Sequence, residues 1–233
     1  MIGAIVLAAG RSERMGGADK LLAPLAGRPL VAHAIATFAA HEGIDTLVVV
    51  VSEANKDTIE ALAVKTARAA HPSRASGRAD WVRVVLGGER RRDSVRAGLE
   101  ALGDCEYVVV HDGARPLVTR ELIDAALAGA RETGAALCAV PVSDTVKRAD
   151  DSGLVRSTVS RQGLWLAQTP QAFRLDILLR AHEATDADAT DDAALVEHLG
   201  EPVRVVPGSA RNLKVTTPAD LRLAAALLAA DSA

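Results

Sequence analysis

The first twenty residues combine small residues with cations, which are the residue types that bind phosphate groups. The apolar run Ile2–Leu7 ends in the small residues 8–10 (Ala-Ala-Gly), and Arg14 and Lys20 follow. Such a run indicates a buried strand that opens into a tight loop. Gly10 lets the backbone approach a ligand closely, and successive backbone N–H groups can form an anion-binding nest. This loop therefore suits a nucleoside triphosphate.

Taken alone, this loop leaves a plainer interpretation open. Basic loops with a glycine follow strands in many α/β domains, so its cations could be ordinary surface charges. Neither the Walker A pattern GxxxxGK[ST] nor the dinucleotide pattern GxGxxG occurs in the chain, so neither of those nucleotide-binding classes is supported.

The elements that would position this loop alternate along the chain. Strands are expected at Ile2–Leu7, Thr46–Val51, Val82–Leu86, Tyr107–Val110 and Ala136–Val140. Helices are expected at Leu30–Ala40, Glu53–Ala69, Asp93–Leu102 and Thr119–Thr133. This order predicts an α/β fold: a Rossmann-like, mainly parallel sheet with helices on both faces. Ligands bind such sheets beyond the carboxyl ends of the strands, where the first loop and the loop His111–Pro116 both fall.

A protruding β-hairpin arm interrupts this rhythm. Two polar segments, Asp144–Arg148 and Leu154–Val159, flank the turn signal Asp150–Gly153. An isolated hairpin is marginally stable in water, so residues 142–163 are interpreted as an arm that packs on a second subunit of a homodimer. The alternative is a flap packed on its own subunit.

The remaining elements follow the arm. The expected series is a strand at Leu164–Ala167, a turn at Gln168–Gln171, a helix at Leu175–Ala184, a helix start at Thr190–Asp192, a strand at Val203–Val206, a further edge at Asn212–Thr216, and a last helix with Thr217 as N-cap and Pro218 as first residue.

Composition limits the class of protein. The 233 residues suffice for one large α/β domain, and we expect a single domain over residues 1–233. The net charge of −3 argues against general nucleic-acid binding. The chain shows no signal peptide and no apolar run long enough for a membrane span, so no membrane partner is expected. Cys105 and Cys138 lie in or beside apolar segments and are interpreted as buried thiols of a cytoplasmic protein.

Several segments together resemble one family. They are Leu7–Gly10 with Arg14, Met15 and Lys20; Gly87-Gly88 with Arg91 and Asp93–Val95; His111–Pro116; Asp144–Lys147; Ser160–Trp165; Gln168–Gln171; and Asn212–Thr216. Over nearly its whole length the chain resembles the 2-C-methyl-D-erythritol 4-phosphate cytidylyltransferases. The first loop alone fits many nucleotidyltransferases, whereas the Arg161 and Lys214 segments make the resemblance specific.

The resemblance implies a role for each group of site residues. Catalytic residues would be Arg14 and Lys20, which stabilise charge on the reacting phosphates, and Arg161 and Lys214, which position methylerythritol phosphate. Cytidine would be surrounded by Ala8, Ala9, Gly10, Gly87, Gly88 and Ser94, with Gly113, where an Ala is common, near the nucleotide. The acceptor side would be lined by Asp112, Arg115, Thr145, Thr169 and Thr190.

The implied reaction moves CMP from CTP to 2-C-methyl-D-erythritol 4-phosphate, giving 4-diphosphocytidyl-2-C-methyl-D-erythritol and pyrophosphate for non-mevalonate isoprenoid synthesis. A phosphate monoester is largely dianionic near neutral pH, because its second pKa is about 6, so it needs no general base. Positioning and electrostatic stabilisation should then carry catalysis. Mg²⁺ is the expected cofactor, bridging triphosphate oxygens, with no protein ligand assigned. His111 is interpreted as a locally hydrogen-bonded strand-end residue.

Three other functions stay open from the residues. The most distant nucleotidyltransferase among them is one for sugar 1-phosphates or molybdopterin, which need not carry the hairpin with Arg161. A ribitol-5-phosphate cytidylyltransferase would share the nucleotide loop and differ in the acceptor pocket. A catalytically silent nucleotide-binding regulator is the alternative from another class, and the presence of Arg14, Lys20, Arg161 and Lys214 together argues against it. No second catalytic domain follows in the sequence, so we expect the form that is not fused to a cyclodiphosphate synthase.

Overall fold

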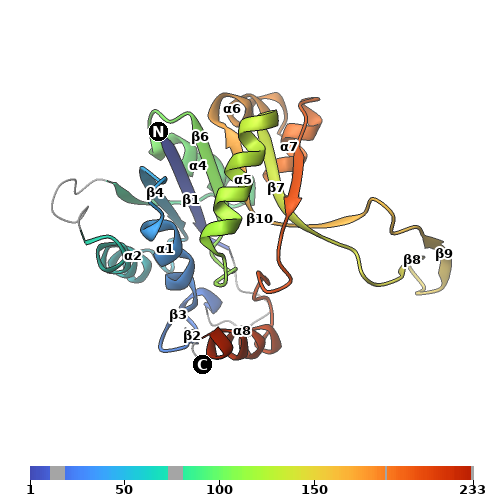
Figure 1. Cartoon of the computed structure of the whole chain (residues 1–233), viewed down its shortest axis with the longest axis horizontal. Coiled ribbons are helices and arrows are strands. Elements are labelled where there is room, and N and C mark those ends of the chain that lie inside the picture. Colours follow the sequence, from blue (N-terminus) through green and yellow to red (C-terminus); the bar gives the residue numbers. More distant parts are fainter. Residues whose placement is uncertain (11–18, 73–80, 187, 232–233) are drawn as a thin grey trace.

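A seven-stranded sheet forms the centre of the computed structural model, which describes residues 1–10, 19–72, 81–186 and 188–231 (Figure 1). Within these ranges its strands are β1 (Ile2–Ala8), β4 (Thr46–Val51), β5 (Val82–Leu86), β6 (Tyr107–Asp112), β7 (Ala135–Pro141), β10 (Trp165–Arg174) and β11 (Arg204–Pro207). Their order is β11-β7-β10-β6-β1-β4-β5. Neighbouring strands are parallel except β10, which runs antiparallel to both β6 and β7.

Helices cover both faces of this sheet. One face packs against α1 (Leu30–Ala40), α2 (Lys56–Ala70), α5 (Arg120–Thr133) and α8 (Pro218–Asp231). The other packs against α4 (Arg91–Leu102), α6 (Leu175–Ala184) and α7 (Asp192–His198). Successive side chains of a strand point to opposite faces, so Val49 and Val51 join the first core and Val48 and Val50 the second. The continuous valine run of β4 is typical of a strand buried on both faces.

The position of β1 fixes where a ligand can bind. β4 lies on one side of β1 and β6 on the other, so the connections leaving this point diverge. A crevice forms at such a switch point, beyond the carboxyl ends of the strands. A short helix, η2 (Lys20–Leu22), and a small hairpin of β2 (Pro24–Leu25) and β3 (Arg28–Pro29) follow this end of β1.

The expected architecture is confirmed, with small shifts at helix starts. All five strands expected before the arm are present, and helices occupy the intervals between them. The helix expected from Glu53 begins at Lys56, and the helix expected from Asp93 begins at Arg91. The Asp191 carboxylate accepts from the Ala194 N–H and caps α7.

Two expectations after the arm are wrong. Gln168–Gln171 is not a turn but lies inside β10, where the pairing with β7 shifts register between Ala167 and Gln171. The shift tolerates Pro170, which has no N–H to donate, inside a strand between two neighbours. Asn212–Thr216 is an irregular segment rather than a sheet edge. The Val215 N–H nevertheless donates to the Ala114 carbonyl, which joins this segment to the end of β6.

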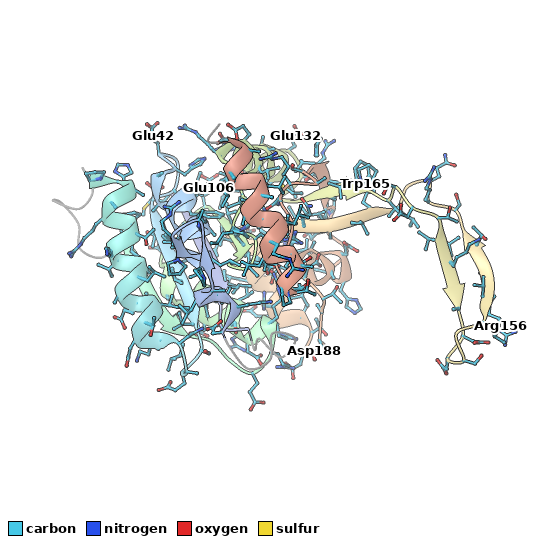
Figure 2. The ribbon with its side chains drawn as sticks, turned by 90° about the horizontal axis from the view of Figure 1, so that it is seen from below. Glu42, Glu106, Glu132, Arg156, Trp165 and Asp188 are labelled. Atoms are coloured by element: carbon cyan, nitrogen blue, oxygen red, sulfur yellow. The ribbon has the colours of Figure 1, made fainter. Side chains whose placement is uncertain are left out.

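The arm projects from the body as a two-stranded hairpin, β8 (Val146–Ala149) and β9 (Val155–Val159) (Figures 1 and 2). A backbone hydrogen bond from Val142 N–H to the Leu164 carbonyl closes its base. Figure 2 shows Trp165 at the root of the arm and Arg156 near its tip. Most side chains of β8 and β9 are exposed.

Candidate active site

A cavity of about 520 Å³ opens at the carboxyl ends of β1, β4, β5 and β6, where the sheet order predicts a ligand. Eight of the residues that the sequence singled out line it: Ala9, Gly10, Lys20, Gly87, Gly88, Ser94, Asp112 and Lys214. Segments far apart in the chain thus meet in one cavity, as the predicted α/β fold requires.

One side of the cavity, where the nucleotide is expected, is built from close backbone packing. A Cβ at Gly87 would lie 2.5 Å from Ser94 Oγ, and one at Gly88 would lie 2.4 Å from Asp93 Cβ. Both positions therefore need glycine. A Cβ at Gly10 meets no described atom within 4 Å, so the space beside it is open to a ligand. This half of the cavity presents bare backbone, which suits a nucleoside.

The other side of the cavity, where the acceptor is expected, is centred on Asp112, the last residue of β6. Its Oδ2 lies 2.8 Å from Lys214 Nζ and 3.9 Å from Arg115 Nε, and its Oδ1 lies 3.8 Å from Arg91 Nε. Burial raises the pKa of Asp112, but the charges of Lys214 and Arg91 outweigh burial and lower this pKa to about 2. Asp112 is therefore ionised at neutral pH and orders three cations around the cavity wall.

His111 supports this wall without entering the cavity. Its Nε2 lies 3.1 Å from the Arg115 carbonyl, which only accepts, so Nε2 carries the proton. Its Nδ1 then accepts from the Thr169 hydroxyl, whose oxygen in turn accepts from the Asp112 N–H. Burial lowers the pKa of His111 to about 4. The local hydrogen-bonding role expected for His111 is confirmed.

Seven of the expected site residues that the structure describes do not line this cavity within the subunit. Ala8 is buried, and Gly113 packs against β1, where a Cβ would lie 2.8 Å from the Leu7 carbonyl oxygen. Thr169 lies behind Asp112, and Arg115 Nη1 donates to the Asn212 carbonyl at 2.7 Å. The other three are described next.

Three of the expected acceptor residues are exposed on other parts of the chain. Thr145 and Arg161 lie near the base of the arm, where Arg161 Nη1 donates to the Ser143 carbonyl. Thr190 is exposed just before α7. Arg14, the remaining expected catalytic residue, lies outside the described residues.

Asn55 is a buried residue near the site that the sequence pattern did not reveal. Its Nδ2 donates to the Ala8 carbonyl at 3.0 Å and to Asp19 Oδ2 at 2.7 Å, and its Oδ1 accepts from the Ser52 N–H. Asn55 thereby ties the end of β1 to the residue before Lys20. In the sequence, Asn55 is only an asparagine between a strand and a helix, and nothing there indicates these contacts with distant residues.

Arg91 is a second residue to which sequence reasoning gave no role. It belongs to the run Arg90–Arg92, whose members diverge in space. Arg90 and Arg91 both line the cavity, but Arg90 pairs with Asp93 at the start of α4, and Arg92 Nη2 donates to the His182 carbonyl. Arg91 Nη1 also lies 2.8 Å from Oδ2 of Asp192, which is completely buried. Only the fold distinguishes the three arginines.

The side chains that line the cavity determine whether it can hold a metal ion. Within the described ranges no three His, Cys, Asp or Glu side chains gather in a way that could hold one. Three carboxylates, Asp112, Glu53 and Glu89, line the cavity, and Asp112 is paired with Lys214. Mg²⁺ bound to phosphates needs only one or two carboxylates, so these residues fit an ion carried by a triphosphate.

None of the described helices has the length and apolar character needed to cross a bilayer.

Known proteins provide an independent comparison. The family model described as 2-C-methyl-D-erythritol 4-phosphate cytidylyltransferase matches residues 2–230. An enzyme of that name from Dehalococcoides mccartyi is 43% identical over 227 residues, covering 97% of this chain and 96% of that protein. One from Bacillus licheniformis is 42% identical over 231 residues, covering 97% and 95%.

A solved structure agrees with these relatives. The crystal structure of 4-diphosphocytidyl-2C-methyl-D-erythritol synthase from Anaerococcus prevotii superposes with a TM-score of 0.80 at 30% identity, covering 98% of each chain. Sequence and structure both match over nearly the whole chain, so the chain belongs to the 2-C-methyl-D-erythritol 4-phosphate cytidylyltransferase family.

Proposed function

We propose that this protein transfers CMP from CTP to 2-C-methyl-D-erythritol 4-phosphate, releasing pyrophosphate. The observation that carries the proposal is one cavity with two unlike halves. Bare backbone at Gly87 and Gly88 forms one half, and Asp112 with Lys214 forms the other. Membership of the family favours this acceptor over ribitol 5-phosphate and favours an enzyme over a silent regulator.

The chemistry follows from the charges of the reactants. An oxygen of the acceptor phosphate bonds to the α-phosphorus of CTP, and the bond from that phosphorus to the oxygen bridging to the β-phosphorus breaks. Pyrophosphate leaves with the electron pair of the broken bond. The acceptor phosphate is already dianionic near neutral pH, since its second pKa is about 6, so no protein base has to remove a proton.

The protein's own residues then have two tasks. Lys20 lines the cavity beside the nucleotide half, and we propose that Lys20 and Arg14 stabilise the negative charge that builds on the phosphoryl oxygens. Lys214, held by Asp112 at 2.8 Å, would position the acceptor phosphate for in-line attack. Mg²⁺ carried by the triphosphate would neutralise its oxygens.

We also propose that two chains form a homodimer through residues 142–163. On the arm, Leu154 and Val155 are exposed by 62% and 61%, and at its root, on β10, Trp165 and Leu166 are exposed by 47% and 57%. Exposed aliphatic and aromatic side chains on and beside a projecting hairpin are typical of a protein interface. In such a dimer Arg161 and Thr145 would reach the partner's cavity, which explains why they lie apart from the cavity of their own chain.

A cytoplasmic location is the last part of the proposal. Cys105 and Cys138 are both free thiols. Cys138 is buried as expected, whereas Cys105 is only half-buried. Free thiols suit a reducing compartment, where disulfides are rare.

The experiment that tests the proposed reaction is pyrophosphate release from the purified chain with Mg²⁺. CTP, UTP, ATP and GTP are each combined with methylerythritol 4-phosphate or with ribitol 5-phosphate. We expect release with CTP and methylerythritol 4-phosphate, at a kcat/KM well above every other combination. Faster release with ribitol 5-phosphate, or release that needs no acceptor, would contradict the proposal.

A further inference from the structure

A series of charged side chains connects α7 to the cavity wall. Asp192 is the first residue of α7, and its Oδ2 lies 2.8 Å from Arg91 Nη1 on α4. Arg91 Nε lies 3.8 Å from Asp112 Oδ1 on β6, and Asp112 Oδ2 lies 2.8 Å from Lys214 Nζ. Arg91, Asp112 and Lys214 line the cavity, whereas Asp192 is completely buried behind them.

A gain in folding stability does not by itself explain why the carboxylate of Asp192 is buried beside Arg91. A buried ion pair loses hydration of both ions, and replacing such a pair by apolar residues is often neutral or stabilising. Beyond Arg91, the other ionisable group close to Asp192 is His182, whose Nε2 lies 3.4 Å from Oδ1. Burial raises the pKa of Asp192, but Arg91 and His182 together outweigh burial and hold this pKa below its ordinary value. Asp192 is therefore a fixed negative charge directed at Arg91.

Arg91 lies between two carboxylates and is held closer to one of them. Its guanidinium approaches Asp192 to 2.8 Å and Asp112 only to 3.8 Å. The short contact of Asp112 is between its Oδ2 and Lys214, while Arg91 faces its Oδ1, so the two cations share one carboxylate. The negative charge of Asp192 behind Arg91 holds Arg91 back from Asp112 and leaves the Lys214 contact as the close one.

We propose that Asp192 and Arg91 are positioning residues for the acceptor half of the site. Asp192 restrains Arg91, and this restraint leaves Lys214 in its pair with Asp112, facing the acceptor phosphate. The inference rests on the proposed function. Without the charge of Asp192, Arg91 moves closer to Asp112, turns that carboxylate toward itself and weakens its contact with Lys214. The nucleotide half, built by Gly87 and Gly88, is unaffected.

The test compares Asp192→Asn with the unaltered chain in the pyrophosphate assay. We expect kcat/KM for methylerythritol 4-phosphate to fall roughly tenfold, since charges in one network couple at this level. The KM for this acceptor rises, and the KM for CTP changes less than about twofold. A merely structural defect would lower kcat through lost active protein and leave both KM values unchanged, which would overturn the inference.

Asp191→Asn is the matched control. Asp191 caps α7 through the Ala194 N–H and accepts from Gln171 Nε2 at 2.8 Å. Asparagine caps helices as well as aspartate does, so this variant makes the same change one residue earlier without releasing Arg91. We expect its acceptor KM to stay within about twofold of the unaltered chain. An acceptor KM raised as much as in Asp192→Asn would overturn the inference.

A double-mutant cycle tests the restraint itself. In an Arg91→Gln background, Asp192→Asn has no arginine to release and should change the acceptor kcat/KM less than about twofold. Losses that multiply across the two sites would overturn the inference. The double variant removes both buried charges together, so the comparison with Arg91→Gln remains decisive if Asp192→Asn alone fails to fold.

The assay also separates this inference from the proposed function. No turnover of methylerythritol 4-phosphate by the unaltered chain would reject the proposed function. Normal turnover by the unaltered chain, together with unchanged acceptor KM values in Asp192→Asn, would reject only the positioning role.

Discussion

Lys214 Nζ lies 2.8 Å from Oδ2 of Asp112, and this pair joins the segment before α8 to the end of β6. The backbone hydrogen bond from Val215 N–H to the Ala114 carbonyl holds the two segments in register. The acceptor half of the site is therefore assembled by contacts between distant parts of the chain. Its cations are fixed before any ligand arrives, which is what electrostatic catalysis requires.

Lys20 should be needed for turnover and not for folding. It lies on the short helix η2 at the cavity, where it would face the triphosphate. Lys20→Ala should lower kcat by about 10²–10³, as expected for a preorganised electrostatic group. Arg14→Ala should behave in the same way. Thermal unfolding midpoints should match the unaltered chain.

Lys65→Ala is the matched control for this prediction, because Lys65 is exposed on α2 away from the cavity. It should leave kcat unchanged. Turnover of Lys20→Ala close to that of the control would remove Lys20 from the mechanism.

The proposed dimer makes a prediction about mixed subunits. Lys20→Ala and Arg161→Ala should each be inactive alone. In a mixed dimer with exchanged arms, one site carries both defects and the other carries neither. Random pairing makes about half of the dimers mixed, each with one intact site, so about a quarter of full activity should return.

Subunits can be mixed by co-expression and activity measured per site. If Arg161 serves its own chain, every site keeps one defect and mixing restores nothing. A monomer at assay concentration, measured by light scattering, would also reject the exchanged arm.

Alanine substitutions at Gly87 and Gly10 should have different effects, one on the stability of the fold and the other on CTP binding. A Cβ at Gly87 would lie 2.5 Å from Ser94 Oγ and 2.7 Å from Ala9 Cβ, so Gly87→Ala should destabilise the fold by about 1–3 kcal/mol. Gly10→Ala meets open space and should keep the unfolding midpoint while raising the KM for CTP. Urea unfolding and CTP titration measure the two effects. A Gly10→Ala variant less stable than Gly87→Ala would contradict this packing.

Asp112 should contribute a pH-dependent part of the stability. Burial raises its pKa, but the charges of Lys214 and Arg91 lower it to about 2, from an ordinary value of 3.8. A carboxyl group with a lower pKa in the folded state stabilises that state above its unfolded pKa, and this contribution is lost as pH falls through the folded pKa. Asp112→Asn should thus be less stable than the unaltered chain at pH 6.

The difference between the two proteins should shrink between about pH 4 and pH 2. Thermal unfolding across this pH range measures it. A difference that stays constant down to pH 2 would show that the charge of Asp112 is not what stabilises the fold.

Local patterns predicted most of the fold, because a buried parallel sheet has a clear signature. The valine run at Thr46–Val51 and the helix patterns around it needed no distant information. The pattern failed at Gln168–Gln171, where proline and polar residues indicate a turn. In the structure, neighbours on both sides hold this segment in β10, so tertiary pairing overrides the local preference.

Lys20 was predictable from its type and its place in the basic loop after the first strand, and Gly87 and Gly88 were predictable from the resemblance to the family. The site was not predictable where the role depends on packing. Arg91 and its neighbours are identical in type, and only the fold turns Arg91 toward Asp192 and Asp112. Asn55 gains its role solely from contacts with distant residues.

The central claim, CMP transfer to methylerythritol 4-phosphate, is tested most directly by following the phosphorus atoms of CTP. The chain is incubated with Mg²⁺, methylerythritol 4-phosphate and CTP labelled with ³²P at either the α or the γ position. We predict that the α label enters the acceptor product in a one-to-one ratio with pyrophosphate, while the γ label appears only in pyrophosphate. Transfer of the γ label to the acceptor, or faster α labelling of ribitol 5-phosphate in its place, would contradict this reaction.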